Sequence, residues 1–285
     1  MLKDGGRNSV TPPMLSSLGT LVDLTILTQI VVLHLALDLV FRVTLGDKRG
    51  KNETGSRLCV LLAYNITAAA VATFCASVGC AAWFGGEAAT IGGTVQSRLY
   101  GESASFARLG AVTAAYEAYN TLVVLVVPEY RTTAFVGHHA ATFVLALLSQ
   151  APYLQYYGLF FFGVASVSSV PLAVVEVAKC AGLTQLHDRA RGVFAAAFLA
   201  LRSLYWPLVS LGFWADSVAA LRGAVAVHSV AAVVTFLVAN VGLTGLQLLW
   251  TKKVVRGVQK ALGLRAPARK ESASEEERRP LKAAG

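Results

Sequence analysis

Residues 58–84 read LCVLLAYNITAAAVATFCASVGCAAWF and contain no charged side chain. As an α-helix rising about 1.5 Å per residue, this run would be about 40 Å long, which exceeds the hydrocarbon core of a bilayer, about 30 Å. A helix on the surface of a soluble protein needs one polar face, and this run has none. The run therefore predicts a helix that crosses a membrane.

Other long, mostly apolar runs occur along the chain. They cover residues 18–41, 106–127, 132–149, 153–178, 192–214 and 222–250, and 132–149 is the shortest. The chain of 285 residues is 55% hydrophobic and only 14% charged, whereas soluble domains carry about 25% charged residues. The sequence predicts an all-α, polytopic integral membrane protein with about seven transmembrane helices.

The net charge of +9 is distributed unevenly between the two sides of the predicted membrane. With the C-terminal tail in the cytoplasm, 19 of the 25 Lys and Arg residues lie on the cytoplasmic side, five lie opposite and Arg202 lies within a span. Cytoplasmic loops are typically enriched in Lys and Arg. We therefore expect a cytoplasmic C-terminal tail and an N-terminus on the opposite side, and we attribute the basic excess to topology, not to nucleic-acid binding.

Several polar side chains fall at similar depths in different predicted spans. From helical rise, His34, Asn120, His138 and His139 lie about 10 Å from the cytoplasmic ends of their spans, and Arg202 lies about 15 Å deep. Ionisable groups in membrane helices usually face a cavity or a partner helix. The common depth predicts one shared cavity that opens towards the cytoplasmic leaflet.

Structural explanations also exist for most of the polar residues within the spans. His34 and Asp38 are four residues apart and can satisfy each other. Glu176, at a helix end, can form an ion pair with Lys179. Amide side chains often make hydrogen bonds between membrane helices, and we expect this of Asn65, Asn240 and Gln247.

Two features are harder to assign to packing alone, the adjacent histidines and Arg202. Neighbouring helical residues project about 100° apart, so one imidazole can face a cavity while the other orients it, and Thr142 can hydrogen-bond either ring. Imidazole can exchange protons near neutral pH or act as a nucleophile, although packing remains the alternative for His138 and His139. The guanidinium of Arg202 needs an acceptor, which can be a carboxylate, a backbone carbonyl or a ligand anion.

The segment Gly137-His138-His139-Ala140-Ala141-Thr142, followed by Leu147-Leu148-Ser149, Tyr157-Gly158 and a Phe-rich helix, resembles the TLC domain family. This family includes ceramide synthases, translocation-associated membrane proteins and smaller lipid-homeostasis proteins. The likeness is specific around 138–149 and more diffuse over 55–262, where Ser168-Ser169-Val170-Pro171-Leu172 and Arg202 with Pro207 are further points of similarity.

The resemblance implies a ring of about six helices around an acyl-chain cavity, in the endoplasmic reticulum or a related membrane. It divides the chain into a polar N-terminal segment (1–17), a first transmembrane helix with a basic loop (18–54), a TLC-like membrane domain (55–262) and a disordered, charged cytoplasmic tail (263–285). By the same resemblance His138 and His139 are candidate catalytic residues, as a base or acyl carrier. The candidate lining of the lipid cavity is Glu117, Asn120, Thr142, Ser168, Ser169 and Arg202.

The sequence departs from the ceramide synthases at the acidic residues. Residues 164–169 contain no carboxylate, and Asn120 stands where the family often has Asp. Glu117 is the one deep carboxylate nearby and can either replace the missing acid or pair with Arg202. Without an acidic partner, the tautomer of a catalytic histidine is not fixed.

These observations favour a role in lipid homeostasis, by binding or sensing acyl lipids in an intramembrane cavity. The alternative is a membrane-embedded N-acyltransferase of ceramide-synthase type with acyl-CoA as co-substrate, and a chaperone for other membrane proteins ranks third. We expect membrane lipids or acyl chains as partners, no nucleic acid, no metal and no resident cofactor, since the chain has five histidines and no histidine boxes. Self-association into a homo-oligomer stays open.

Overall fold

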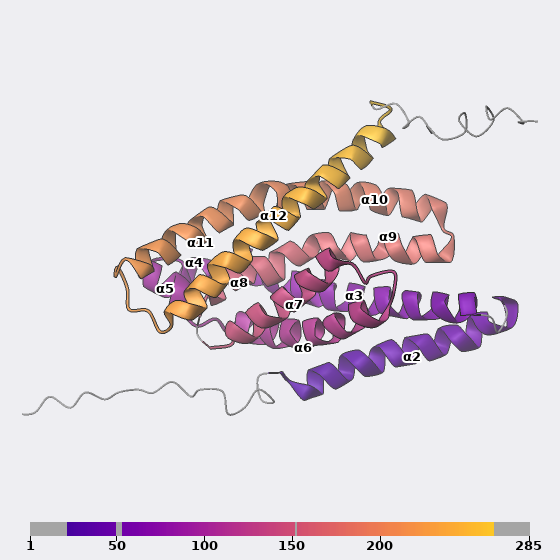
Figure 1. Ribbon diagram of the computed structural model, residues 1–285, viewed down its shortest axis with the longest axis horizontal. Helices are drawn as coiled ribbons and strands as arrows, with labels where there is room; N and C mark the ends of the chain where they lie inside the picture. Colours follow the sequence, from indigo (N-terminus) through magenta and orange to yellow (C-terminus); the bar gives the residue numbers. More distant parts are fainter. Residues whose placement is uncertain (1–21, 50–52, 152, 265–285) are drawn as a thin grey trace, which may run out of the picture.

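A computed structural model describes residues 22–49, 53–151 and 153–264, which form helices joined by short connections (Figure 1). The predicted N-terminal segment 1–17 lies outside the described residues, and so does the predicted tail from residue 265 onwards. The division of the chain into these domains therefore stays a prediction.

Apolar helices account for most of the described chain. The longer ones are α2 (Leu24–Arg49), α3 (Glu53–Phe84), α6 (Ala104–Val126), α7 (Thr133–Leu148), α9 (Ser169–Ala181), α10 (Thr184–Phe198), α11 (Trp206–Leu221) and α12 (Val230–Ala261). Short helices α4 (Glu87–Ile91), α5 (Val95–Tyr100) and α8 (Gln155–Gly158) lie at one end of the molecule, on the left in Figure 1.

Within the described residues, six continuous helical segments are long and apolar enough to cross a membrane. They are Leu24–Leu45, Gly55–Phe84, Ala104–Val126, Gln155–Ala181, Thr184–Leu221 and Val230–Ala261. The predicted all-α polytopic membrane fold is confirmed. The run at 132–149 also forms a helix, but at 16 residues α7 is shorter than the other six.

Two of the long segments depart from α-helical geometry. The segment 155–181 passes through a π-helical turn, η1 (Leu159–Gly163), and a 3₁₀ turn, η2 (Val164–Ser168), and the segment 184–221 passes through a π-helical stretch, η3 (Leu199–Tyr205). Pro207 follows η3 and has no N–H to bond the carbonyl four residues back, which favours irregular backbone there. Such interruptions of an α-helix often mark functional sites, and the 3₁₀ turn η2 carries Ser168 while the π-helical η3 carries Arg202.

The helices surround a central space. Side chains from α3, α6, α7, the segment 155–181, the segment 184–221 and α12 line one internal cavity, whereas none comes from the described part of α2. Helix α2 packs outside this ring against α3 and α6 and presents exposed apolar side chains such as Leu35, Leu39 and Val43. This arrangement agrees with the predicted ring of six helices.

Candidate functional site

The cavity has a volume of about 820 Å³, which lies within the range of about 300–1,000 Å³ that is usual for small-molecule sites. Most of its wall is apolar or aromatic. All the residues that the sequence nominated for the site line this cavity, namely Glu117, Asn120, His138, His139, Thr142, Ser168, Ser169 and Arg202. The helices thus bring together side chains that are up to 85 positions apart in the sequence.

Of the two adjacent histidines, His139 is the one with an acidic partner. Its Nδ1 lies 2.7 Å from Oε2 of Glu117 and 3.2 Å from Nδ2 of Asn120. Glu117 and Asn120 are three residues apart on α6 and therefore present the same face to α7. The carboxylate contact is the shorter one and favours the tautomer with a proton on Nδ1, which leaves Nε2 as the basic nitrogen.

The acidic partner of the histidine pair is therefore Glu117 of α6, and not a residue of the segment 164–169. Of the two roles left open for Glu117, the structure shows the pairing with His139, and its carboxylate makes no ion pair with Arg202. The orientation of the Asn120 amide is also fixed, because its Oδ1 accepts a hydrogen bond of 2.8 Å from the hydroxyl of buried Tyr64. A carboxylate that orients an imidazole in this way also stabilises the imidazolium form.

His138 has a different environment from its neighbour. Its Nδ1 is buried and finds no hydrogen-bond partner among the described residues. The ring packs edge-on against His139 and Trp250, with centroid distances of 5.0 and 5.4 Å. The predicted bond from Thr142 to either ring is wrong, because its hydroxyl donates to the backbone carbonyl of His138 at 2.9 Å. This follows from helix geometry, which places that carbonyl within reach of a Thr one turn later.

Arg202 bonds neutral acceptors. Its Nε donates to Oγ of Ser168 at 2.8 Å, and its Nη2 donates to the carbonyl of Ala165 and to Oγ of Ser169, both at 3.1 Å. The backbone carbonyl, one of the three acceptors expected for it, is therefore used. The irregular η2 turn makes this possible, because it directs a carbonyl and the Ser168 hydroxyl sideways towards η3.

The structure corrects some of the packing predictions and supports others. His34 and Asp38 do not bond each other: His34 contacts the hydroxyl of Tyr119 at 2.8 Å, and Asp38 pairs with Arg42 at 2.6 Å. The predicted ion pair between Glu176 and Lys179 is present at 3.4 Å.

The amide side chains also divide into two groups. Asn240 accepts from Nε1 of Trp214 and joins α12 to α11 as predicted, whereas Asn65 donates to the hydroxyl of Tyr130, which lies in the connection between α6 and α7. Neither amide atom of Gln247 finds a partner in the described part of the chain, so the prediction is wrong for this residue. No three His, Cys, Asp or Glu side chains gather in a metal-binding group within the described ranges.

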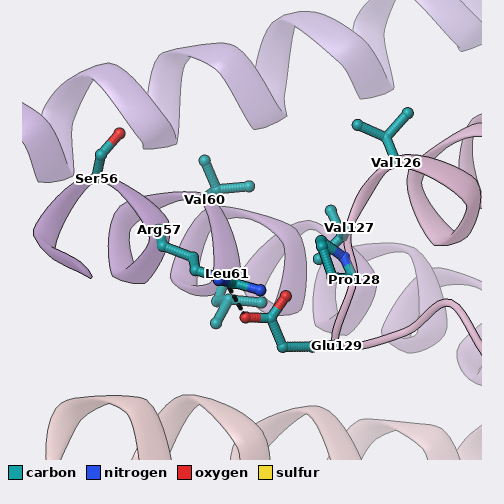
Figure 2. Close-up of a pocket in the computed structure, with 8 residues that line it drawn as sticks. All are labelled: Ser56, Arg57, Val60, Leu61, Val126, Val127, Pro128 and Glu129. Carbon is teal, nitrogen blue, oxygen red and sulfur yellow. Dashed lines mark ion pairs between the residues drawn. The ribbon is translucent and has the colours of Figure 1, made fainter. Parts of the chain in front are cut away.

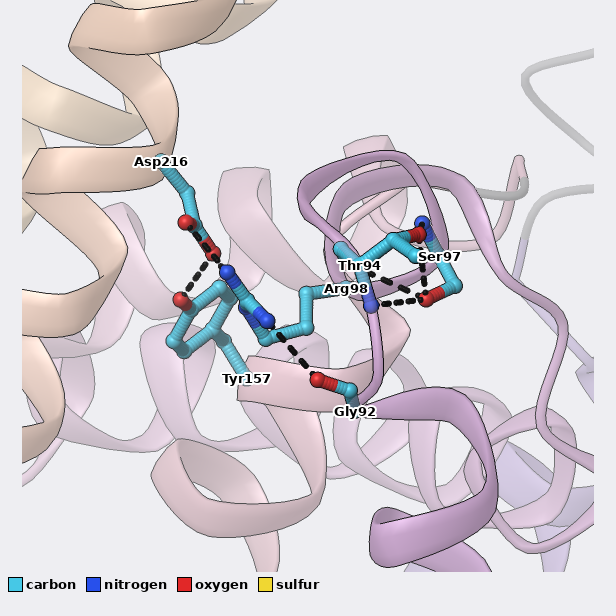
Figure 3. A network of polar contacts seen from close by, with 6 residues as sticks. All are labelled: Gly92, Thr94, Ser97, Arg98, Tyr157 and Asp216. Atoms are coloured by element: carbon cyan, nitrogen blue, oxygen red, sulfur yellow. Dashed lines mark hydrogen bonds and ion pairs between the residues drawn. The ribbon is translucent and has the colours of Figure 1, made fainter.

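A second polar cluster at one end of the cavity was not predicted from the sequence (Figure 3). Arg98 on α5 makes two bonds to Asp216 on α11, at 2.6 and 2.7 Å, and a third to the carbonyl of Gly92. The Tyr157 hydroxyl also donates to Asp216. These hydrogen bonds with Asp216 raise the pKa of Arg98, which therefore stays charged.

Sequence reasoning missed this cluster because it ended the span at residue 214, two positions before Asp216. The structure continues α11 to Leu221. An acidic residue directly after an apolar run and an Arg in the short loop between two spans were the available signals. Tyr157 also lines the cavity, so the cluster braces that end of the ring.

Charged residues also gather at the opposite end, where α6 and α9 finish. Figure 2 shows a smaller pocket of about 350 Å³ between α3 and the connection after α6, across which Arg57 pairs with Glu129. The hydrogen bond from Arg57 lowers the pKa of Glu129. Glu129 also lines the large cavity, together with Glu176, Lys179 and Lys253, so this end of the cavity is polar.

Comparison with known proteins agrees with this architecture. The model of the TLC domain family matches residues 57–256, well over half of the chain. No curated protein and no solved structure matches. The matched region begins in α3 and ends in α12, so it covers the cavity and all the ring helices and does not include α2. The chain belongs to the TLC domain family of membrane proteins.

Proposed function

We propose that this protein binds the acyl chains of membrane lipids in the cavity and acts in lipid homeostasis, in the endoplasmic reticulum with its C-terminal tail in the cytoplasm. The observation that carries the proposal is the cavity itself. Its largely apolar wall suits an acyl chain, and polar side chains interrupt this wall at several places. The basic nitrogen of His139, the Ser169 hydroxyl and Arg202 can bind the polar end of a lipid there.

Blocking the cavity should abolish lipid binding while the fold persists. Ala68 lines the cavity from α3, and Ala70 is exposed on the same helix and does not line it. We expect a neutral, clickable fatty alcohol with a photoreactive diazirine to label peptides of the ring helices. Ala68→Trp should lower this labelling severalfold, because the indole fills the space that the chain would occupy.

Ala70→Trp is the matched control, since it adds the same side chain facing outwards. Its labelling should equal that of the unmodified protein. Equal labelling of the Ala68→Trp and Ala70→Trp variants, or labelling confined to the outer face of α2, would contradict binding in the cavity.

The hydrogen bond between His139 and Glu117 favours a second candidate, acyl transfer. In this reaction, Nε2 of His139 would take the proton from an amine as its nitrogen attacks the thioester carbonyl of acyl-CoA. A C–N bond would form, the C–S bond would break, and the proton would leave with the thiol of CoA. Glu117 would stabilise the imidazolium that forms in between.

Lipid profiles of cells that express variants of the pair distinguish the two candidates. If the protein is a transferase, Glu117→Gln and His139→Ala should each lower product formation by at least about 100-fold. His138→Ala should have the smaller effect, because its Nδ1 has no partner among the described residues to orient it. Unchanged lipids with a stably made His139→Ala variant would eliminate acyl transfer and leave lipid binding.

A further inference from the structure

Arg202 is a positive charge within the membrane-spanning part of the chain whose bonds are all to neutral groups. Its partners are two serine hydroxyls and one backbone carbonyl. Glu117 is near enough for its charge to act on Arg202, but the Glu117 carboxylate is already bonded to His139. Among the described residues, no carboxylate forms an ion pair with Arg202. A cation in a medium of low dielectric constant is costly without an anion beside it.

The guanidinium of Arg202 also has N–H donors that can bond a ligand in the cavity. Nε and Nη2 are used by the η2 turn, whereas Nη1 has no partner in the described chain. Arg202 and Ser169 both line the cavity, and the Ser169 oxygen accepts from Arg202, so its proton is available for another acceptor. Nη1 and this hydroxyl therefore provide donors for one anionic group.

The space beyond Arg202 is apolar. Trp206 and Phe213 follow it on the same segment and line the cavity, and Phe236 of α12 joins them. Eleven residues separate Arg202 from Phe213, which corresponds to about 16 Å along the helix. A charged donor group thus adjoins an apolar part of the cavity wall, as a molecule with one charged head and one chain requires.

We propose that Arg202, with the Ser169 hydroxyl, is the binding site for the carboxylate of a free fatty acid whose chain extends towards Phe213. This inference rests on the proposed function, since it names the lipid that the cavity takes. A monoanion compensates the single guanidinium charge. A phosphate monoester would add further negative charge in the field of Glu117, and a fatty alcohol or ester would leave Arg202 without a counter-ion.

Competition against the neutral photoreactive fatty alcohol tests the site in the purified full-length protein, at mildly alkaline pH. Palmitate should displace the probe at a concentration at least about ten-fold lower than palmityl alcohol does, as expected for charge-assisted hydrogen bonds. Palmitate should also compete better than palmitoyl lysophosphatidic acid. In Arg202→Gln the advantage of palmitate over the alcohol should vanish, whereas Arg202→Lys should keep part of it.

Arg222→Gln is the matched control, because Arg222 is exposed just after α11, and it should behave as the unmodified protein does. If Arg202→Gln fails to fold, Ser169→Ala takes its place and should reduce the advantage of palmitate. Equal competition by acid and alcohol, an advantage that survives Arg202→Gln or Ser169→Ala, or equal competition by the phosphate lipid would overturn the proposal. These outcomes leave acyl binding intact, whereas absence of all labelling in the cavity would instead remove the proposed function.

Discussion

Replacing Asp216 with alanine should lower the free energy of unfolding by about 3 kcal/mol or more. Asp216 is buried, and its two oxygens accept both bonds from Arg98 as well as one from Tyr157. Its removal would leave the guanidinium of Arg98, whose side chain is only 24% exposed, without its anion. The loss of one partner from a buried ion pair usually costs about 3–5 kcal/mol, because the remaining charge is poorly solvated.

Thermal unfolding of the purified protein in detergent measures this effect as a fall in Tm. The control is Glu129→Ala, which breaks the ion pair with Arg57, where the two side chains are 54% and 33% exposed. Exposed pairs contribute about 1 kcal/mol or less, so this variant should change Tm only slightly. Similar Tm values for the two variants would show that the Arg98 cluster does not brace the ring.

Replacing Gly79 with alanine should destabilise the protein by a comparable amount, for a steric reason. A Cβ atom at Gly79 would lie 2.3 Å from Cα of Gly163 and 2.7 Å from the backbone nitrogen of Val164. Backbone atoms cannot rotate away as a side chain can, so α3 and η1 would have to separate. Overpacking typically costs about 1–3 kcal/mol, and a clash with backbone atoms lies at the upper end of this range.

The displacement would also reach the site. Gly163 directly precedes η2, whose Ser168 holds Arg202, so a shift of this turn would disturb the guanidinium. Close contact between small residues is how membrane helices gain packing area without a hydrophobic driving force.

Gly242→Ala, on α12, is the control for the helix propensity of alanine. No atom lies within 4 Å of the added Cβ there, so the substitution should leave Tm unchanged or raise it, since alanine favours helix over glycine by about 1 kcal/mol. The Tm of both variants is to be measured by the same thermal unfolding assay. A Gly79→Ala protein as stable as Gly242→Ala would show that α3 and η1 do not depend on this contact.

The sequence by itself determined the order and approximate positions of the apolar helices. It predicted about seven spans, and six segments of the described chain are long enough to span a membrane, with α7 shorter. Runs such as 58–84 are apolar on every side and longer than the hydrocarbon core, and such a segment satisfies its backbone groups only as a helix. The sequence also nominated a set of residues that all line one cavity, because ionisable and amide side chains are expensive in lipid and converge where lipid is excluded. The His138–Thr142 motif identified the family.

The partners of those side chains were decided only by the tertiary structure. A helix that is apolar all round carries little periodic signal for its rotation, so the sequence could not show which side of α6 faces α7. That rotation pairs Glu117 with His139, and Arg202 forms its hydrogen bonds with the η2 turn instead. It also separates His34 from Asp38, and the extra turns of α11 bring Asp216 to Arg98. Bonds a few ångströms long depend on helix rotation and register, whereas the apolar composition of a run fixes only that the helix spans the membrane.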